Sequence, residues 1–588
     1  MNLYMKHNII FKKGRFFITL LSVVALFSCT DGFETLNTYP LEPPYVPGST
    51  DPGQTDNDIN LPDTISKTEL NSLKQGANSI GALFRNYSYQ GLVNDYQRTT
   101  NLTHDIYGGY FATNKVDFLN CSPNYIYTDG WSAKRWDHFY KERCAEYKTL
   151  ARTFKYVNSE AYRNAYYITR IYFVFLTSTM TDTYGDMPFT PYLQCASIPE
   201  KVPYDTQKVV YDKMLRILKQ ATDSIKPGKC SFKFSSSEDK CYQGDEEKWL
   251  RFANTLRLRL ALRISNIDPV RAKQEGEAAL TQTYGVMKSQ EDRMKTIPAY
   301  APVAMGGDND GGNENEVANC SFRYVDAVMS KDLELAYKNQ SNILDPRCEI
   351  SWYRPTPMEL LSVGIEFTEQ DYNGCEIGSS AIEHASDVYS VLRVNSTDDK
   401  SILKDDYWFG YSREYLWLGY SECLFLKAEA ALRGWGGVGQ TPEELFKEGI
   451  RANFDYYHLP ATKATNYING LKIYSGAIEN PFATGNKESQ LEQIITQKWL
   501  SIFPNGNEGW AEFRRTDYPR LRNHLNNLDG NIPGKKFINR VRYPNDEYDY
   551  NPENVPSFGT VNQSTRVWWD VEDTNAASGE RNSINNFR

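Results

Sequence analysis

The sequence has few of the residues that active-site chemistry usually requires. It contains 6 His among 588 residues, and none of the five beyond the N-terminal segment is three or four positions from another: His104, His138, His384, His458 and His524. It also has no Cys-x-x-Cys pair and no Gly-x-Ser-x-Gly sequence. A helical metalloprotease site, a zinc ribbon, a thioredoxin-type centre and a hydrolase nucleophile elbow therefore have no support. We expect each His to lie at the surface or in a hydrogen bond, and we predict no catalytic residue, metal or cofactor.

Positive charge is also scarce, because 65 Lys and Arg stand against 74 Asp and Glu and give a net charge of −9. Nucleic-acid binding draws its free energy from clustered basic residues, and the sequence contains no basic stripe. A nucleic-acid partner is therefore not expected. With 40% hydrophobic and 24% charged residues the chain is globular, and 41 Tyr give it an aromatic excess that suits wet binding surfaces.

Long apolar stretches are confined to the N-terminus. Four basic residues, Lys6, Lys12, Lys13 and Arg15, precede an apolar stretch over residues 16–27. A bilayer crossing takes about 20 apolar residues, so this pattern predicts a secretory signal over residues 1–28. The junction Leu26-Phe27-Ser28-Cys29 resembles the lipobox of bacterial lipoproteins. We therefore expect Cys29 to become the first mature residue and to carry the lipid anchor; the alternative is an ordinary signal peptide with a chance Cys near its end.

The segment after Cys29 has the composition of a tether. Residues 30–63 hold six Pro and seven acidic residues and no Lys or Arg. Such a segment repels itself, and we expect it to be extended and unpacked. The predicted domains are thus a lipoprotein signal peptide over residues 1–28, an acidic Pro-rich tether over residues 29–63 and a helical body over residues 64–588.

Nine Cys remain after Cys29, and an odd number leaves at least one free thiol in a single chain. Cys230 and Cys241 flank a short polar loop and form the most plausible pair, with unpaired thiols as the alternative. Cys423 lies in a helical apolar pattern and is expected in the core.

Apolar spacing predicts helices in the body. Residues spaced by three and four positions mark one helical face over residues 161–179, a second over residues 210–225 and a third over residues 249–260. Four arginines stand among the apolar residues of the third segment: Arg251, Arg257, Arg259 and Arg263. We expect them to pair with carboxylates of neighbouring helices.

The clearest unit is a helical hairpin over residues 416–457. Its first helix is predicted to start at Leu416 and end at Gly434, and Thr441-Pro442-Glu443-Glu444 is a capping box that starts the second. Gly434-x-Gly-x-x-Gly439 matches the glycine spacing of a dinucleotide-binding site. Such a site must follow a strand, whereas this string follows a predicted helix, so we expect it to form a turn.

Two other polar segments partly resemble ligand sites. Gly530 to Lys536 lacks both the spacing and the hydroxyl residue of a phosphate-binding loop. Gly306 to Glu316 contains four carboxylates and three Asn without a basic residue, which suits either calcium or a solvated loop.

Several strings, read in order, resemble the SusD-like (SusD/RagB) nutrient-binding outer-membrane lipoproteins. Besides the lipobox they are Thr181 to Phe189, Asn254 to Arg263, Tyr420 to Ala430, Gly509 to Pro519, Tyr548 to Val555 and Arg566 to Asp570. The resemblance implies a mainly α body with tetratricopeptide-like helix pairs and long ligand-binding loops. It also implies structural roles for Asp186, Arg514 and Trp568.

The function that the resemblance implies is capture without catalysis. A lipoprotein at the cell exterior would bind a nutrient, here an oligosaccharide, and deliver it to a TonB-dependent (SusC-like) transporter. Two alternatives stay open: a lipid-anchored glycoside hydrolase or lyase on a helical scaffold, and a helical-repeat adaptor that recognises only protein.

Sugar rings present an apolar face and a polar rim, so they bind flat aromatic rings flanked by hydrogen-bonding groups. Long loops are expected around residues 100–130, 284–322, 345–412 and 530–588. Rings in such loops are the candidate ligand contacts, and the alternative is that they pack the loops onto the body: Tyr107, Tyr110, Trp352, Tyr353 and Trp408.

Overall fold

The computed structural model describes residues 58–90, 95–296, 316–394, 414–472, 482, 485–532, 537–571 and 586–587. These residues belong to one compact unit that runs from Thr55 to Arg588. Cys29, Trp408 and nearly all of the acidic loop at residues 306–316 lie outside the described residues.

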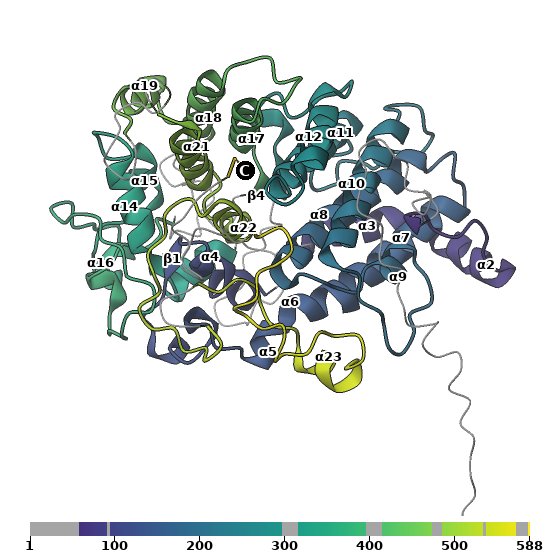
Figure 1. The fold of residues 1–588 in the computed structure, drawn as a ribbon, viewed down its shortest axis with the longest axis horizontal. Helices are drawn as coiled ribbons and strands as arrows, with labels where there is room; N and C mark the ends of the chain where they lie inside the picture. Colours follow the sequence, from purple (N-terminus) through teal and green to yellow (C-terminus); the bar gives the residue numbers. More distant parts are fainter. Residues whose placement is uncertain are drawn as a thin grey trace, which may run out of the picture. The chain divides into compact units, whose positions relative to one another are not determined.

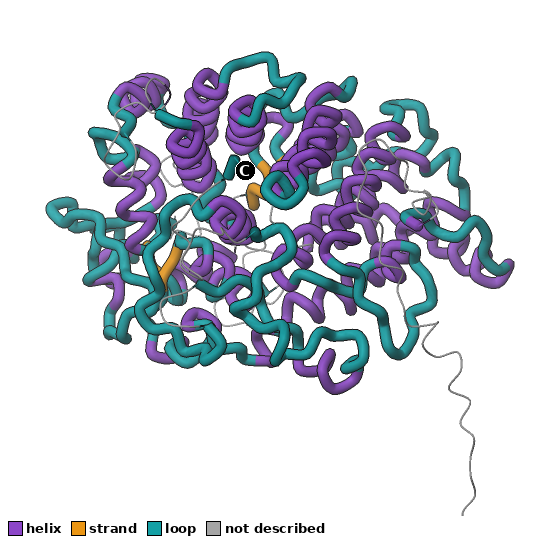
Figure 2. The backbone as a smooth tube through the Cα atoms, viewed as in Figure 1, coloured by secondary structure: helices purple, strands orange, loops and turns teal. Residues whose placement is uncertain are grey.

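Helices dominate the described chain, as Figures 1 and 2 show. The longer ones are α2 (Lys67–Gly76), α3 (Ile80–Gln90), α7 (Cys144–Tyr156), α8 (Arg163–Tyr184), α10 (Gln207–Ser224), α11 (Glu246–Arg263), α12 (Pro269–Thr281), α14 (Lys331–Asn339), α17 (Tyr420–Leu432), α18 (Pro442–Tyr456), α19 (Ala461–Asn469), α21 (Lys487–Ser501) and α22 (Gly506–Thr516). Shorter ones are α4 (His104–Tyr107), α5 (Asp129–Ser132), α6 (Lys134–Asp137), α9 (Thr190–Leu193), α13 (Glu316–Ala318), α15 (Pro346–Ser351), α16 (Met358–Leu361) and α23 (Asn545–Tyr550). The predicted mainly α fold class is confirmed.

The helices that the sequence analysis predicts are present in the structure. Helices α8, α10 and α11 coincide with the three predicted periodic segments, and the capping box of Thr441 and Glu444 starts α18, the second helix of the predicted hairpin. The predicted start at Leu416 is wrong, because α17 begins at Tyr420 and Leu416 belongs to a strand. Gly434, Gly437 and Gly439 have positive φ and form the turn between α17 and α18, as expected.

The long helices pack one on the next. Helix α7 packs on α8, α8 on α10, α10 on α11, α11 on α12 and α17, and α17 on α18 and α21, as can be followed in Figure 1. The pair α17 and α18 is especially close at Gly449, where an added Cβ would lie 2.7 Å from the ring of Phe425. This arrangement agrees with the expected helix pairs.

Two short antiparallel ribbons accompany the described helices. Strand β1 (Phe111–Ala112) pairs with β3 (Val328–Met329), with Phe111 opposite Met329. Strand β2 (Met294–Thr296) pairs with β4 (Tyr415–Leu418), with Met294 opposite Leu418. Each ribbon joins segments far apart in the chain, so these strands could not be predicted from local spacing.

The packed body begins earlier than residue 64. Ile59 and Leu61 are 0% and 2% exposed, although the sequence analysis assigned them to an unpacked tether. Arg216 donates to both carboxylate oxygens of Asp58, at 3.0 and 2.8 Å, and the Lys155 ammonium donates to the Leu61 carbonyl. We call residues 58–63 the strap, because they lie across the body and are held by these contacts.

The nine described cysteines are all free thiols, and most are buried. The expected pairing of Cys230 with Cys241 is therefore wrong in this structure. Cys241 is 3% exposed and its backbone N–H donates to Asp239, whereas Cys230 is half-buried in the preceding segment. Cys423 is fully buried, as expected. Within the described ranges, no helix combines the length and apolar character needed to cross a membrane.

The C-terminal segment closes over the helices through aromatic and arginine contacts. The Arg514 guanidinium lies 3.6 Å from the ring centroid of Trp510 and 4.9 Å from that of Trp569. It also donates to the carbonyls of Asp182 and Asn539, at 2.7 and 2.8 Å. Trp569 in turn donates to the Asp182 carboxylate at 2.8 Å. The expected structural role of Arg514 is thus confirmed.

Candidate functional site

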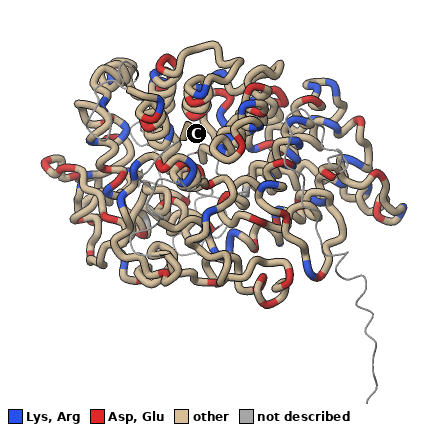
Figure 3. Tube along the Cα trace, viewed as in Figure 1, with Lys and Arg blue, Asp and Glu red and all other residues tan. Residues whose placement is uncertain are grey.

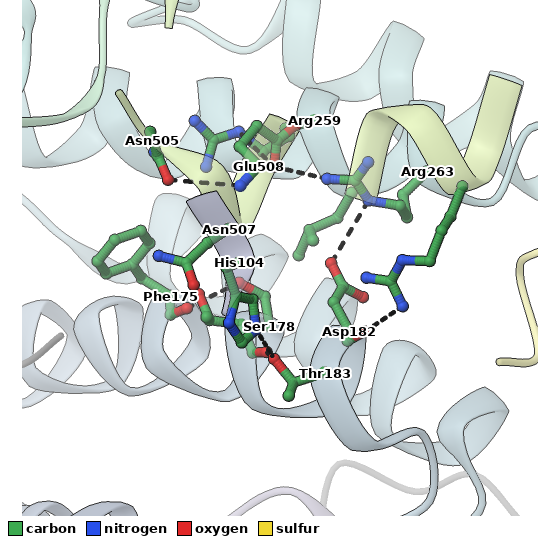
Figure 4. A pocket seen from close by; sticks show the side chains of 13 residues that line it. His104, Phe175, Ser178, Asp182, Thr183, Arg259, Arg263, Asn505, Asn507 and Glu508 are labelled. Atoms are coloured by element: carbon green, nitrogen blue, oxygen red, sulfur yellow. Dashed lines mark hydrogen bonds and ion pairs between the residues drawn. The ribbon is translucent and has the colours of Figure 1, made fainter. Parts of the chain in front are cut away.

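The densest group of ionisable side chains lies where α8, α11, α17, α21 and α22 meet. Arg263 is 1% exposed and donates to Glu508 and Glu512 at 2.6 Å each, and it lies 3.4 Å from Asp182. Figure 4 shows Arg263, Asp182 and Glu508 converging. We call this group the buried ion-pair cluster, and its members are Asp182, Arg259, Arg263, Glu422, Glu429, Lys498, Glu508, Glu512 and Arg515.

The charges in this cluster are matched and hydrogen-bonded. Lys498 lies 2.9 Å from Glu508 and 3.4 Å from Glu512, and Arg259 donates to both oxygens of Glu422 at 2.9 and 2.7 Å. The expectation that the α11 arginines pair with carboxylates of neighbouring elements is confirmed, since Arg257 also pairs with Glu275 of α12. Figure 3 shows both signs of charge intermixed along the described chain, in agreement with the absence of a basic stripe.

Three acids of the cluster, Glu429, Glu508 and Glu512, are held in their charged form, whereas burial raises the pKa of Asp182. Burial would raise the pKa of Glu512, but Arg515, Lys498 and Arg263 outweigh it and hold that pKa well below its usual range. The pKa of Glu508 is likewise lowered, because Arg263, Lys498 and Arg259 outweigh its desolvation. Such carboxylates do not exchange protons near neutral pH, which a general acid or base must do.

The cavity beside the cluster is too small for a sugar. Its volume is about 20 Å³, which is room for one water molecule, and it is lined by residues that include His104, Asp182 and Arg263. His104 Nε2 lies 2.8 Å from the Thr183 hydroxyl, and burial together with Arg135 and Arg514 lowers the pKa of its imidazole. His104 is therefore a hydrogen-bonded core residue, as expected.

One buried carboxyl has the pKa of a general acid but no access to substrate. Burial raises the pKa of Asp105 to about 7, although Tyr96, Asn101 and the Gly506 amide donate hydrogen bonds to it. Asp105 is 0% exposed. The described residues contain no group of three or more His, Cys, Asp or Glu side chains that could hold a metal ion.

The four described aromatic candidates lie inside the body. Tyr107 and Tyr110 are 5% and 0% exposed, and their hydroxyls donate to the carbonyls of Ser122 and Trp499. Trp352 and Tyr353 are 0% and 7% exposed. Their burial supports the alternative that these rings pack loops onto the body. Trp408, the fifth candidate, lies outside the described residues.

Each of these rings is buried by a partner that is distant in sequence. The ring of Tyr110 stacks on that of Trp499 at 4.7 Å, and Trp352 lies 5.5 Å from Phe111 and 5.6 Å from Phe503. The Arg393 guanidinium lies 4.5 Å from the ring centroid of Tyr353. No local pattern distinguishes these loop rings from exposed ones.

The structure instead presents a polar rim made of Gln97, Lys115 and Tyr324, together with Asp326, whose carboxylate is buried. Lys115 bridges the Asp326 carboxylate at 2.8 Å and the Tyr324 carbonyl at 3.1 Å, and Gln97 donates to Asp326 at 2.5 Å. Tyr324 is 48% exposed. An exposed ring on a surface that also carries amide and ammonium groups is the chemistry that binds saccharides. Sequence analysis missed this rim, because its members come from separate segments.

The rim lies where widely separated parts of the chain meet. The ring centroids of Tyr96, which precedes Gln97, and Tyr415 of β4 are 6.4 Å apart. The Tyr415 hydroxyl accepts a hydrogen bond from the backbone N–H of Glu316 at the start of α13, and Tyr415 stacks on Trp417 at 5.6 Å. Tyr415 of β4 thus contacts both α13 and Tyr96, the residue next to Gln97 of the rim.

Comparisons with known proteins agree with this organisation. The chain matches a sequence model of the family described as "SusD-like: Susd and RagB outer membrane lipoprotein" over residues 58–570. No curated protein matches the chain.

Solved structures show the same fold. A chitin-binding SusD homolog from Flavobacterium johnsoniae is 28% identical, with a TM-score of 0.67 over 86% of this chain and 100% of that one. A SusD homolog from Bacteroides ovatus is 26% identical, with a TM-score of 0.66 over 84% of this chain and 100% of that one. Another from Parabacteroides distasonis is 24% identical, with a TM-score of 0.70 over 84% and 98%.

Proposed function

The chain belongs to the SusD/RagB family of outer-membrane lipoproteins, and on that premise we propose that it binds an oligosaccharide reversibly at the cell surface. It then delivers that oligosaccharide to a TonB-dependent, SusC-like transporter in the same membrane. The observation that carries the proposal is the similarity to a chitin-binding homolog. That homolog is 28% identical and is covered over its full length.

The surface chemistry of the described chain supports binding rather than turnover. The rim offers an exposed Tyr ring and the partly exposed Lys115 and Gln97 side chains, which can take up a sugar face and its hydroxyls. The buried carboxylates considered above are tied up in ion pairs or closed off from solvent.

Glycan binding is tested with the full-length lipoprotein, purified in detergent, against a panel of neutral oligosaccharides that includes chito-, cello- and malto-oligosaccharides. We expect saturable binding of at least one class by titration calorimetry. Tyr324→Ala should weaken this binding about two- to twelvefold, since an aromatic contact contributes about 0.5–1.5 kcal/mol. Tyr550→Ala, which changes a 74% exposed ring outside the rim, is the matched control and should leave binding unchanged. Failure of every glycan to bind would contradict the proposal.

The anchor and the partner are tested in cells. Cys29 should incorporate labelled fatty acid, Cys29→Ala should release the protein from the outer membrane, and a protease added outside intact cells should cleave the wild-type chain. A TonB-dependent transporter should co-purify with the lipoprotein from solubilised membranes. Retention of the transporter without binding of any glycan would favour a protein-recognising adaptor.

A lipid-anchored glycoside hydrolase or lyase is the second candidate function. It requires two carboxyl groups placed on either side of a bound sugar. Turnover that is lost when one Asp or Glu is replaced would establish this alternative in place of reversible capture.

A further inference from the structure

A pocket lined partly by residues of the strap lies in a part of the chain that contributes nothing to the rim. Its volume is about 540 Å³, within the range of small-molecule sites. We call it the strap groove, and the residues that matter for its chemistry are Lys155, Arg163, Tyr166, Tyr167, Gln194 and Gln220. They come from α7, α8, α10 and the turn after α9, which Figure 1 places in the same part of the fold.

The walls of the groove are held in place by hydrogen bonds. Arg170, fully buried on α8, donates to the side chains of Asn60 at 3.2 Å and Gln220 at 2.6 Å. Gln194 donates to the Asp58 carbonyl at 3.0 Å, and Arg216 fixes the Asp58 carboxylate. The groove is therefore preformed, which reduces the entropy that a ligand would lose on binding.

One cation in the groove stands apart from its neighbours. Arg152 is paired with Glu69, Arg216 with Asp58 and Asp212. Arg163, by contrast, has no hydrogen-bond or ion-pair partner among the described residues, and its Nε is buried without an acceptor. A buried donor left unpaired costs about 1–3 kcal/mol, so an anion at this position would be stabilised.

The remaining groups suit a sugar that carries a carboxylate. A guanidinium matches a carboxylate with two parallel hydrogen bonds. The half-buried Tyr167, packed edge-on against Tyr166 at 5.1 Å, offers an aromatic ring and a hydroxyl without a partner in the described chain. Gln220 uses its Oε1 to accept from Arg170, so its amide nitrogen is available as a donor to sugar hydroxyls.

The net charge of the groove is positive. Lys155 adds a second cation, and its nearest carboxylate, Asp63, lies 3.6 Å away with a fully exposed side chain. We infer that the strap groove is a second ligand site, which binds an acidic saccharide with its carboxylate on Arg163 and its ring against Tyr167. This site is independent of the neutral-glycan site at the rim.

The test uses the full-length lipoprotein and oligosaccharides of galacturonic or mannuronic acid, with neutral oligosaccharides of equal length for comparison. Titration calorimetry should show binding of a uronate that weakens as salt rises from 50 to 300 mM. Arg163→Ala should weaken it at least tenfold, Arg163→Lys less, and Tyr167→Ala several-fold. Arg85→Ala, an exposed arginine on α3 outside the groove, is the matched control and should have no effect.

The outcomes separate this inference from the proposed function. Neutral-glycan binding at the rim should survive Arg163→Ala, and circular dichroism should show that the variant is folded. Absence of uronate binding, or uronate binding unchanged by Arg163→Ala, would overturn the inference. A variant that carries both Asp51→Asn and Asp56→Asn removes two acids from the segment before the strap. Uronate binding that appears only in this variant would also overturn the inference, because it would mean that this acidic segment competes for the groove.

Discussion

Arg263 links α11 to α8 and α22 within the buried ion-pair cluster. It contacts three carboxylates from α8 and α22 and is 1% exposed. Replacing one partner of a buried ion pair leaves the other charges uncompensated, which costs more than losing a surface pair.

We therefore expect Arg263→Ala to lower the free energy of unfolding by about 3–5 kcal/mol, measured by urea denaturation. Lys447→Ala is the control, because its pair with Glu443 on α18 is exposed and contributes about 1 kcal/mol or less. Equal losses in the two variants would show that the cluster does not stabilise the fold in the way its geometry indicates.

Single residues also mark the limit of sequence analysis. The pairing of the α11 arginines could be predicted, since charged side chains that alternate with a core face need partners. The burial of Tyr110 could not be predicted, because its partner Trp499 is far along the chain. The same holds for Tyr324, whose exposure beside Lys115 depends on contacts between separate segments.

At the level of elements, the close contact of α17 and α18 depends on Gly449. Replacing a glycine in a helix interior by Ala normally stabilises a protein by up to about 1 kcal/mol where the new Cβ has room. At Gly449 the added Cβ would meet the Phe425 ring at 2.7 Å, and overpacking costs about 1–3 kcal/mol.

We expect Gly449→Ala to destabilise the protein by about 1–2 kcal/mol in thermal unfolding. Gly130→Ala on α5 has open space around the new Cβ and should be neutral or slightly stabilising. A stabilising effect of Gly449→Ala would mean that the two helices can separate without cost.

The carboxylates that α17 and α22 contribute to the cluster give the stability a predictable dependence on pH. Burial would raise the pKa of Glu429, but Arg515 and Arg433 outweigh it, and the pKa values of Glu508 and Glu512 are lowered by their own cationic partners. Unfolded Glu titrates near pH 4.3, so the unfolded chain takes up protons there before these folded carboxylates do.

The free energy of unfolding should therefore fall as the pH is lowered from about 5 towards 3, and the fall should be shallower in Arg263→Ala. Urea denaturation at a series of pH values checks this. If the free energy of unfolding falls equally steeply in Arg263→Ala, the pH dependence comes from groups outside the cluster.

Elements were predictable where the signal was local. The apolar spacing of α8, α10 and α11 and the capping box of α18 are local to each helix, and the structure contains all four helices. Strand β4 was missed because its partner β2 precedes it by more than a hundred residues, so Leu416 was assigned to a helix.

On the scale of the whole molecule, the ordered family strings predicted the architecture better than any single motif. The match over residues 58–570 begins at the first residue of the strap, so the matched region and the packed body start together. The nutrient could not be predicted, because the rim and the strap groove are each assembled by folding from separate segments.

The central claim is that this chain captures a glycan and releases it unchanged. The most direct measurement equilibrates the full-length lipoprotein with a bound oligosaccharide and then analyses the recovered sugar by anion-exchange chromatography. The account predicts saturable binding with every molecule recovered at its original length and without new reducing ends. Shortened or unsaturated products that increase with time and protein concentration would contradict it.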